Sequence, residues 1–275
     1  MAAVNLRFAP LAGCLLACTP IGPSSTPAQP ASDPPAAVTP VASDARTEPA
    51  PEPEPEPAPE PTPEPVSDFG VLHEDLNAHY EEETDVEQWR DRFEHGPREV
   101  RFKQPLILKE VGLAKGDRVA DIGAGTGLYT FPFAKAVGKS GRVFAVDVQD
   151  YFLEYLQAQA KERGLTQVRT VKATQTSVSL EDGSIDVAFL CDAYHHIEHP
   201  EPYLKSLHAA LRPGGRLVVV DYAKVEGATA FIQHHLRDSP DTFRAEIEAA
   251  GFRFVRSADF LDDNFLFVFE RPKAR

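Results

Sequence analysis

The segment that most constrains this chain is a glycine-rich run directly after a short apolar stretch. Residues 119–127 read Val-Ala-Asp-Ile-Gly-Ala-Gly-Thr-Gly, so three glycines spaced two apart follow an acidic residue. Because glycine has no Cβ, such a backbone turns sharply and lets a ligand approach it closely. At the carboxyl end of a parallel strand, a loop of this kind is where open α/β sheets bind nucleotide-like ligands. The segment therefore predicts an α/β sheet with a ligand site at this loop.

A second acidic residue follows at the distance expected for ribose recognition. Residues 143–147 read Val-Phe-Ala-Val-Asp, an apolar strand that ends in Asp147. This aspartate lies about 20 residues past the loop, where such sheets place the acid that binds ribose hydroxyls. A carboxylate has two acceptor oxygens, so we expect Asp147 to accept a hydrogen bond from each hydroxyl.

The spacing of the glycines separates two classes of cofactor. Dinucleotide-binding loops follow the pattern G-x-G-x-x-G, which in this chain requires glycine at position 128 or 130. Those positions hold Leu128 and Thr130. A nicotinamide-dependent oxidoreductase is therefore the less favoured alternative.

The pattern Asp121-x-Gly123-x-Gly125-x-Gly127 instead resembles motif I of the class I S-adenosylmethionine-dependent methyltransferases. The resemblance implies an α/β fold over residues 100–275, with a doubly wound, mainly parallel, Rossmann-like sheet of seven strands that includes one antiparallel strand. It also implies S-adenosylmethionine as the cofactor, with the loop around its methionine end. The implied cofactor-binding residues are Asp121, Gly123, Gly125, Gly127, Asp147, Thr174, Gln175 and Asp192.

The expected adenine contact departs from the family pattern. In that family an acid followed by a small residue, after the third strand, commonly contacts the adenine. This chain reads Ala-Thr-Gln-Thr over residues 173–176, so the acid is absent. We expect Thr174 or Gln175 to bond the adenine amino group instead.

A histidine-rich loop follows the fourth expected strand. Residues 191–199 read Cys-Asp-Ala-Tyr-His-His-Ile-Glu-His. In the family that the chain resembles, this loop faces the sulfonium and the substrate, which implies that Tyr194, His195 and His196 orient or deprotonate an acceptor. Histidine suits that task because its ordinary pKa lies nearest neutrality. The alternative is that the two histidines only shape the loop.

Other polar residues in or near this loop give weaker indications of a metal or substrate site. Asp192, the two histidines of the loop and His199 are considered as a metal set, but no second cluster with ligand spacing supports them. No metal is therefore predicted. Asp221 and Tyr222 end the fifth expected strand on the substrate side. His234 and His235 are expected as a pair on a helix surface.

The apolar pattern alternates between strands and helices from residue 100 onward, which argues for a doubly wound parallel sheet. The last two strands follow each other without a crossover helix, so one must be antiparallel to its neighbour. Strands are expected from 119 and over 142–148, 168–171, 185–190, 216–220, 252–255 and 265–269. Helices are expected over 100–111, 128–137, 152–163, 202–211 and 243–250.

The N-terminal part has a different composition. Residues 19–68 are rich in proline and glutamate and poor in large apolar residues, so we expect a disordered, extended tether. Residues 1–18 form a short apolar leader in which Leu-Ala-Gly-Cys14 resembles a lipobox and Leu-Leu-Ala-Cys18 is a looser match. These features predict a lipoprotein anchored to the bacterial cell envelope through Cys14 or Cys18. A cytoplasmic protein with a mis-assigned start is the alternative, since S-adenosylmethionine is made in the cytosol.

Residues 69–99 are expected to form lid helices before the main domain. They contain the only tryptophan, Trp89, together with Arg92 and Phe93. Covering the cofactor and packing against the sheet edge are equally compatible with this composition.

The overall charge of the chain disfavours some classes of binding partner. The net charge of −14 is divided equally between residues 1–68 and the rest, and no basic stripe occurs, which disfavours nucleic acid. The chain reads Asp-Ala-Tyr-His over 192–195 and lacks the Asn/Asp-Pro-Pro-Tyr signature of methyltransferases that act on nucleobase or glutamine amino groups. We therefore expect methyl transfer to a small-molecule or lipid-like acceptor. The alternative is a non-catalytic lipoprotein that binds S-adenosylmethionine. The oligomeric state is not indicated.

Overall fold

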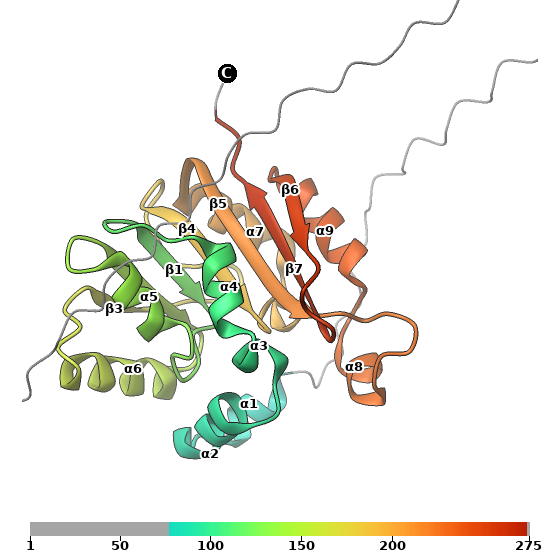
Figure 1. The fold of residues 1–275 in the computed structure, drawn as a ribbon, viewed down its shortest axis with the longest axis horizontal. Coiled ribbons are helices and arrows are strands. Elements are labelled where there is room, and N and C mark those ends of the chain that lie inside the picture. The colour runs from blue at the N-terminus through green and yellow to red at the C-terminus, as the bar shows by residue number, and fades with distance from the viewer. Residues whose placement is uncertain (1–76, 274–275) are drawn as a thin grey trace, which may run out of the picture. The chain divides into compact units, whose positions relative to one another are not determined.

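A seven-stranded sheet forms the centre of the domain, in the order β3-β2-β1-β4-β5-β7-β6 (Figure 1). The computed structural model describes residues 77–273. The expected leader, the expected tether and the start of the expected lid segment lie outside the described residues. The strands are β1 (Arg118–Ile122), β2 (Arg142–Asp147), β3 (Val168–Lys172), β4 (Ile185–Cys191), β5 (Leu211–Tyr222), β6 (Arg253–Ala258) and β7 (Asn264–Glu270).

The strand directions confirm the expected sheet. The strands β3, β2, β1, β4 and β5 pair in parallel. Strand β7 is antiparallel to both β5 and β6. Only residues 259–263 separate β6 from β7, which is too short for the crossover that a parallel pair requires. The fold is therefore a doubly wound, mainly parallel α/β sheet with one reversed strand.

Helices cover both faces of this sheet. Among residues 77–273, none of them is both long and apolar enough to cross a membrane. The α-helices are α1 (Ala78–Glu82), α2 (Val86–Arg90), α3 (Glu99–Phe102), α4 (Gln104–Val111), α5 (Thr130–Val137), α6 (Asp150–Glu162), α7 (Pro200–Ala210), α8 (Ala230–His235) and α9 (Pro240–Ala249). Two short turns complete the set, the π-helical η1 (Asp91–His95) and the 3-10 helical η2 (Tyr194–His196).

The central strand β4 shows why the sheet is buried on both sides. Successive side chains of a strand point to opposite faces. Ala188 and Leu190 belong to a core with α7 and α9, whereas Val187 and Phe189 belong to a core with α4, α5 and α6. All four side chains are buried. This explains why the sequence of β4 is almost continuously apolar rather than alternating.

Most elements begin or end within a few residues of the expected positions, and two differ in a way that proline explains. The helix expected over 100–111 is divided into α3 and α4, with Pro105 in the first turn of α4. Proline is tolerated there because the first backbone N–H groups of a helix have no intrahelical partner. The fifth strand begins at Leu211 and includes Pro213, where its pairing with β4 is irregular. Irregular pairing is the setting in which a strand accommodates proline.

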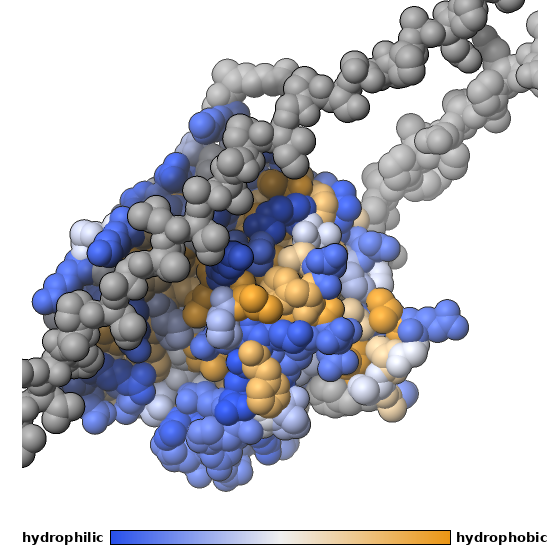
Figure 2. All heavy atoms as spheres, viewed as in Figure 1, coloured by the Kyte–Doolittle hydropathy of each residue, from blue (hydrophilic) through white to orange (hydrophobic). Residues whose placement is uncertain are grey.

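The short helices α1 and α2 present a polar outer surface. Figure 2 shows mainly hydrophilic residues over them at the bottom of the view. Their large apolar side chain, Trp89 of α2, points inward and is only 2% exposed. The Trp89 ring stacks on Tyr80 at 4.7 Å between centroids and lies 6.1 Å from the ring of Phe152 in α6. These helices are therefore attached to the sheet domain through an aromatic cluster.

A buried ion pair between Arg237 and Glu246 of α9 also holds the turn η2, through Tyr194. The Arg237 guanidinium donates to both carboxylate oxygens of Glu246, at 2.5 and 2.6 Å. The Tyr194 hydroxyl donates to the same carboxylate at 2.7 Å. The side chains of Arg237 and Glu246 are 0% and 1% exposed. Because each charge is satisfied only by the other members, removing one leaves an uncompensated charge in the interior.

Replacing Glu246 with alanine is expected to lower the free energy of unfolding by about 3–5 kcal/mol, because Arg237 stays buried without its partner. Chemical denaturation of the full chain, followed by circular dichroism, measures this change. The matched control is Glu201→Ala, which removes an exposed pair with Lys205 and is expected to cost less than about 1 kcal/mol. Equal losses in the two variants would contradict the role assigned to the buried pair.

Candidate active site

A cavity opens at the carboxyl ends of β1, β2 and β4, where the sequence places the ligand site. Seven of the predicted site residues line it: Asp121, Gly123, Gly125, Asp147, Gln175, Asp192 and His196. Residues of the N-terminal segment close it from the other side, namely Asn77, Tyr80, Glu81, Phe93 and Arg98. The cavity therefore lies between the strand ends and the expected lid.

The glycines after β1 serve two different purposes. All three have positive φ angles, +69° at Gly123, +51° at Gly125 and +90° at Gly127, a region that favours glycine. Gly123 and Gly125 line the cavity. Gly127 does not, and a Cβ there would lie 2.6 Å from the Phe131 ring and 2.7 Å from Leu156. Glycine at 127 is therefore required by close packing against α5 and α6, and its expected contact with the cofactor stays a prediction.

The Asp147 carboxylate holds the loop of β1 against the end of β2. Its Oδ2 accepts a hydrogen bond from the Gly125 amide at 2.9 Å, and its Oδ1 accepts one from the Gln149 amide at 2.9 Å. Burial raises the pKa of Asp147, while these backbone donors act in the opposite direction. Each carboxylate oxygen has a second acceptor position. Asp147 is therefore placed to accept further hydrogen bonds from a molecule in the cavity.

Asp121 lies at the end of β1, facing the same cavity. Its Oδ2 accepts a hydrogen bond from the Thr130 hydroxyl at 2.5 Å. The residue is 3% exposed, and this burial raises the pKa of Asp121 to about 7. A cation beside this carboxylate would favour its charged form.

Thr126 is a cavity residue that sequence reasoning missed. It lies between two glycines of the loop and is 1% exposed. Its hydroxyl is buried and has no hydrogen-bond partner within residues 77–273. Buried polar groups are almost always hydrogen-bonded. The loop thus contains a donor and acceptor that a ligand in the cavity can satisfy.

Asp192 lines the cavity but already has two side-chain partners. Arg98 donates to its Oδ2 at 2.5 Å, and Asn264 donates to its Oδ1 at 2.7 Å. Burial raises the pKa of Asp192, while Arg98 acts in the opposite direction. The carboxylate therefore joins β4 to β7 and to the segment before α3. Neither partner was identified from the sequence, since they lie 94 and 72 residues away.

The polar pair expected near the adenine is divided by the structure. Gln175 is exposed and lines the cavity. Thr174 is exposed outside it and forms an isolated bridge with Ser177. Of the two alternatives left open by the sequence, the geometry favours Gln175.

The three candidate catalytic side chains of η2 point to three different places. His196 lines the cavity, whereas Tyr194 and His195 do not. Tyr194 is fully buried and bonded to Glu246, so the prediction that it orients an acceptor is wrong. The His195 Nδ1 lies 2.6 Å from Asp221 Oδ1, and both side chains are almost completely buried. Asp221 was expected to face the substrate, but its carboxylate instead holds the His195 ring.

His196 is the histidine that borders the cavity. Its Nδ1 lies 2.9 Å from Asn77 Oδ1, and its Nε2 lies 3.4 Å from the Tyr80 hydroxyl. Burial, with neighbouring histidines, lowers the pKa of His196 well below its usual range. The imidazole is therefore neutral at physiological pH and has one nitrogen available as an acceptor.

The lid segment contacts the cavity through residues that the sequence did not single out, except Phe93. Trp89 does not line the cavity; its Nε1 donates to the Glu83 carbonyl at 2.9 Å. Arg92 lies over the Trp89 ring at 4.9 Å. Of the two alternatives for Trp89, the geometry therefore favours packing. No spacing signal precedes the glycine loop, so Asn77 and Tyr80 had no distinguishing pattern.

The two histidines of α8 differ in exposure: His234 is exposed, as expected, and His235 is half-buried. The expectation for His235 is wrong, because its Nε2 lies 3.2 Å from His195 Nε2. Burial and the neighbouring histidines lower the pKa of His235 to about 4.

Comparison with known proteins agrees with this arrangement. Residues 120–219 match the family model described as a methyltransferase domain. The chain is 34% identical over 129 residues to the ubiquinone/menaquinone biosynthesis C-methyltransferase UbiE of Azotobacter vinelandii, covering 46% of this chain and 51% of the relative. The chain thus spans about half the length of the curated relatives it matches.

Solved structures share the fold over a larger part of the chain. An S-adenosylmethionine-dependent methyltransferase from Aquifex aeolicus is 25% identical with a TM-score of 0.60, covering 68% of this chain and 97% of that protein. The [4+2]-cyclase SpnF, 18% identical with a TM-score of 0.54, covers 62% of this chain and 80% of its own and shows likeness of fold alone. The match over residues 120–219, the similar relatives and the shared sheet show that the described region has the fold of the class I S-adenosylmethionine-dependent methyltransferases and contains a match to a methyltransferase domain.

Proposed function

We propose that this protein transfers a methyl group from S-adenosylmethionine to a small-molecule or lipid-like acceptor. The observation that carries the proposal is the open cavity beside the glycine loop, into which both Asp121 and Asp147 face. Side chains of the domain do not fill this crevice, and the two carboxylates border one common space. This is the arrangement that a cationic nucleoside across the ends of β1 and β2 requires.

The residues present fit that cofactor. Gly123 and Ala193 both line the cavity, and a Cβ at Gly123 would lie 2.7 Å from the Ala193 Cβ, so glycine at this position lets the loop lie close to Ala193 at the cavity wall. Asp147 has acceptor positions for ribose hydroxyls, and Asp121 offers a carboxylate to the ammonium group. The unsatisfied Thr126 hydroxyl supplies one further polar contact. When bound, S-adenosylmethionine supplies a methyl group already activated by the sulfonium.

The protein's contribution to such a reaction is mainly positioning. The leaving group is neutral, so holding an acceptor in line and excluding water accounts for most of the rate. Asn77, Tyr80 and Phe93 close the cavity opposite the strand ends. His196 is the cavity-lining imidazole with an available nitrogen, so we assign it to orient the acceptor or to accept its proton.

Two alternative functions concern the same cavity. The first is a non-catalytic protein that binds S-adenosylmethionine without transferring the methyl group. The likeness to a cyclase shows that this fold also serves other chemistry. A nicotinamide enzyme would require the dinucleotide spacing that the loop lacks. Incubating the purified protein with labelled S-adenosylmethionine and cell extract, and following which metabolite gains the label, tests turnover and identifies the acceptor.

Replacing Asp147 with alanine is expected to weaken binding of S-adenosylhomocysteine by about 100-fold, because hydrogen bonds from two ribose hydroxyls to a charged group are lost. Isothermal titration calorimetry measures this, with NAD as a ligand that should give no signal. Asp150→Ala is the matched control, since that nearby carboxylate is 75% exposed and pairs with Lys172. Unchanged affinity in the Asp147 variant would refute the ribose assignment.

As the pH is raised towards 7, the affinity for S-adenosylhomocysteine is expected to increase by up to about tenfold per pH unit, and above pH 7 it is expected to level off. Burial raises the pKa of Asp121 to about 7, and the ligand ammonium favours the ionised form, so binding releases a proton. Calorimetry in buffers of different ionisation enthalpy counts that proton. Asp121→Asn should remove the dependence; a variant with the same pH profile as the unaltered protein would rule out Asp121 as the linked group.

We also propose that the protein is anchored to the cell envelope through Cys14 or Cys18. The support is the lipobox-like sequence around these cysteines and the proline-rich stretch after them; both lie outside the described residues. Expression in bacteria with labelled palmitate is expected to label the unaltered protein and to lose the label in Cys14→Ala or in Cys18→Ala. Absence of label from the unaltered protein would favour the cytoplasmic alternative.

A further inference from the structure

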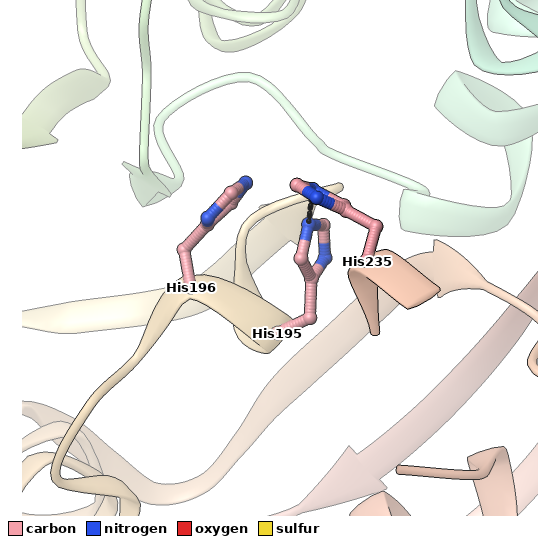
Figure 3. A group of neighbouring side chains, drawn as sticks. All are labelled: His195, His196 and His235. Carbon is pink, nitrogen blue, oxygen red and sulfur yellow. Dashed lines mark hydrogen bonds between the residues drawn. The ribbon is translucent and has the colours of Figure 1, made fainter. Parts of the chain in front are cut away.

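Three histidines converge at the edge of the cavity from two separate elements. His195 and His196 come from η2, and His235 comes from α8 (Figure 3). One ring nitrogen of each lies within 4.8 Å of the others. From this convergence we propose that His195, His196 and His235 form a binding site for a divalent transition-metal ion of the zinc type.

The spacing suits a metal with imidazole ligands. Zinc binds histidine nitrogen at about 2.0–2.1 Å in tetrahedral geometry, which places two such nitrogens about 3.3 Å apart. The Nε2 atoms of His195 and His235 are 3.2 Å apart and face each other. A nitrogen of His196 lies within 4.8 Å of the other two. An ion that uses His196 Nε2 would replace its present contact with the Tyr80 hydroxyl, 3.4 Å away.

Hydrogen bonds to the other ring nitrogen orient two of the three imidazoles. His195 Nδ1 lies 2.6 Å from the Asp221 carboxylate. An ionised carboxylate can only accept a hydrogen bond, so Nδ1 carries the proton. The Nε2 of His195 therefore carries the lone pair in the neutral ring. A carboxylate behind a histidine ligand is the usual outer-shell partner at metal sites, where it fixes the tautomer and raises ligand basicity.

The second imidazole is oriented in the same way by an amide. The Asn77 amide nitrogen donates to the His196 carbonyl at 3.0 Å and to Glu198 at 2.8 Å. Its oxygen is thereby left to accept from His196 Nδ1, 2.9 Å away. This arrangement makes His196 Nε2 the acceptor. Two residues from different parts of the chain thus leave the lone pairs of two histidines in the orientation that a cation requires.

The position of the site indicates how an ion would act. Three protein ligands leave a fourth position open, the arrangement of catalytic rather than structural zinc sites. His196 lines the cavity, so the open position adjoins the space assigned to the acceptor. An oxygen-bearing acceptor coordinated there would lose its proton more readily. This last step rests on the proposed methyl transfer and would replace direct proton acceptance by His196, because the same nitrogen would hold the ion. Metal binding itself does not rest on the proposed function.

Titration of the metal-free full chain with Co²⁺ tests the site directly. The expected result is one ion bound per chain with the intense visible absorption of a tetrahedral complex, displaced by Zn²⁺. His235→Ala should weaken binding by more than about 100-fold, because loss of an outer-shell partner alone costs 10–100-fold. Asp221→Asn, which alters only the partner behind His195, should weaken Co²⁺ binding by about 10–100-fold.

The neighbouring residue supplies the matched control. His234→Ala removes an exposed histidine from the same helix and should bind Co²⁺ as the unaltered protein does. Circular dichroism and thermal melting in the presence of a chelator establish that each variant is folded. Absence of tetrahedral Co²⁺ binding, or equal binding by the His234 and His235 variants, would overturn the proposal. Either result leaves the Asp147-dependent binding of S-adenosylhomocysteine untouched, so failure of the metal site and of the proposed function are distinguishable.

Discussion

The hydrogen bond from the Gly125 amide to the Asp147 carboxylate is the interaction on which the site depends. It joins the ends of two adjacent parallel strands and requires a left-handed backbone at Gly125, which only a residue without Cβ adopts readily. The same carboxylate also accepts from the amide that precedes α6. One buried charge thereby fixes the loop of β1, the end of β2 and the start of a helix while keeping acceptor positions open to the cavity.

The other side of the cavity is held by a second buried carboxylate. Asp192 at the end of β4 pairs with Arg98 and accepts from Asn264. The first partner belongs to the segment that follows the lid helices, and the second begins the reversed strand β7. Removing Arg98 would leave the charge of Asp192 without compensation in a buried environment. This ion pair therefore joins the N-terminal segment to the centre of the sheet.

The histidine cluster shows how the same turn serves packing and chemistry. Tyr194 is directed into the interior, His195 toward Asp221 and His235, and His196 toward the cavity. Three successive residues on a tight 3-10 turn point in different directions. The turn η2 therefore lies between the buried network of α9 and the wall of the cavity.

Short-range patterns in the chain are enough to predict the parallel sheet, its reversed strand and the two acids of the loop region. These patterns are apolar strands, glycine spacing and an acid about 20 residues past the loop. The packing of Gly127, the inward direction of Tyr194 and the contact of His235 with His195 follow from the three-dimensional fold. The pairs Arg98–Asp192 and His195–His235 are separated by 94 and 40 residues. Contacts across such distances depend on how helices pack on the sheet, and a single sequence carries no spacing that records them.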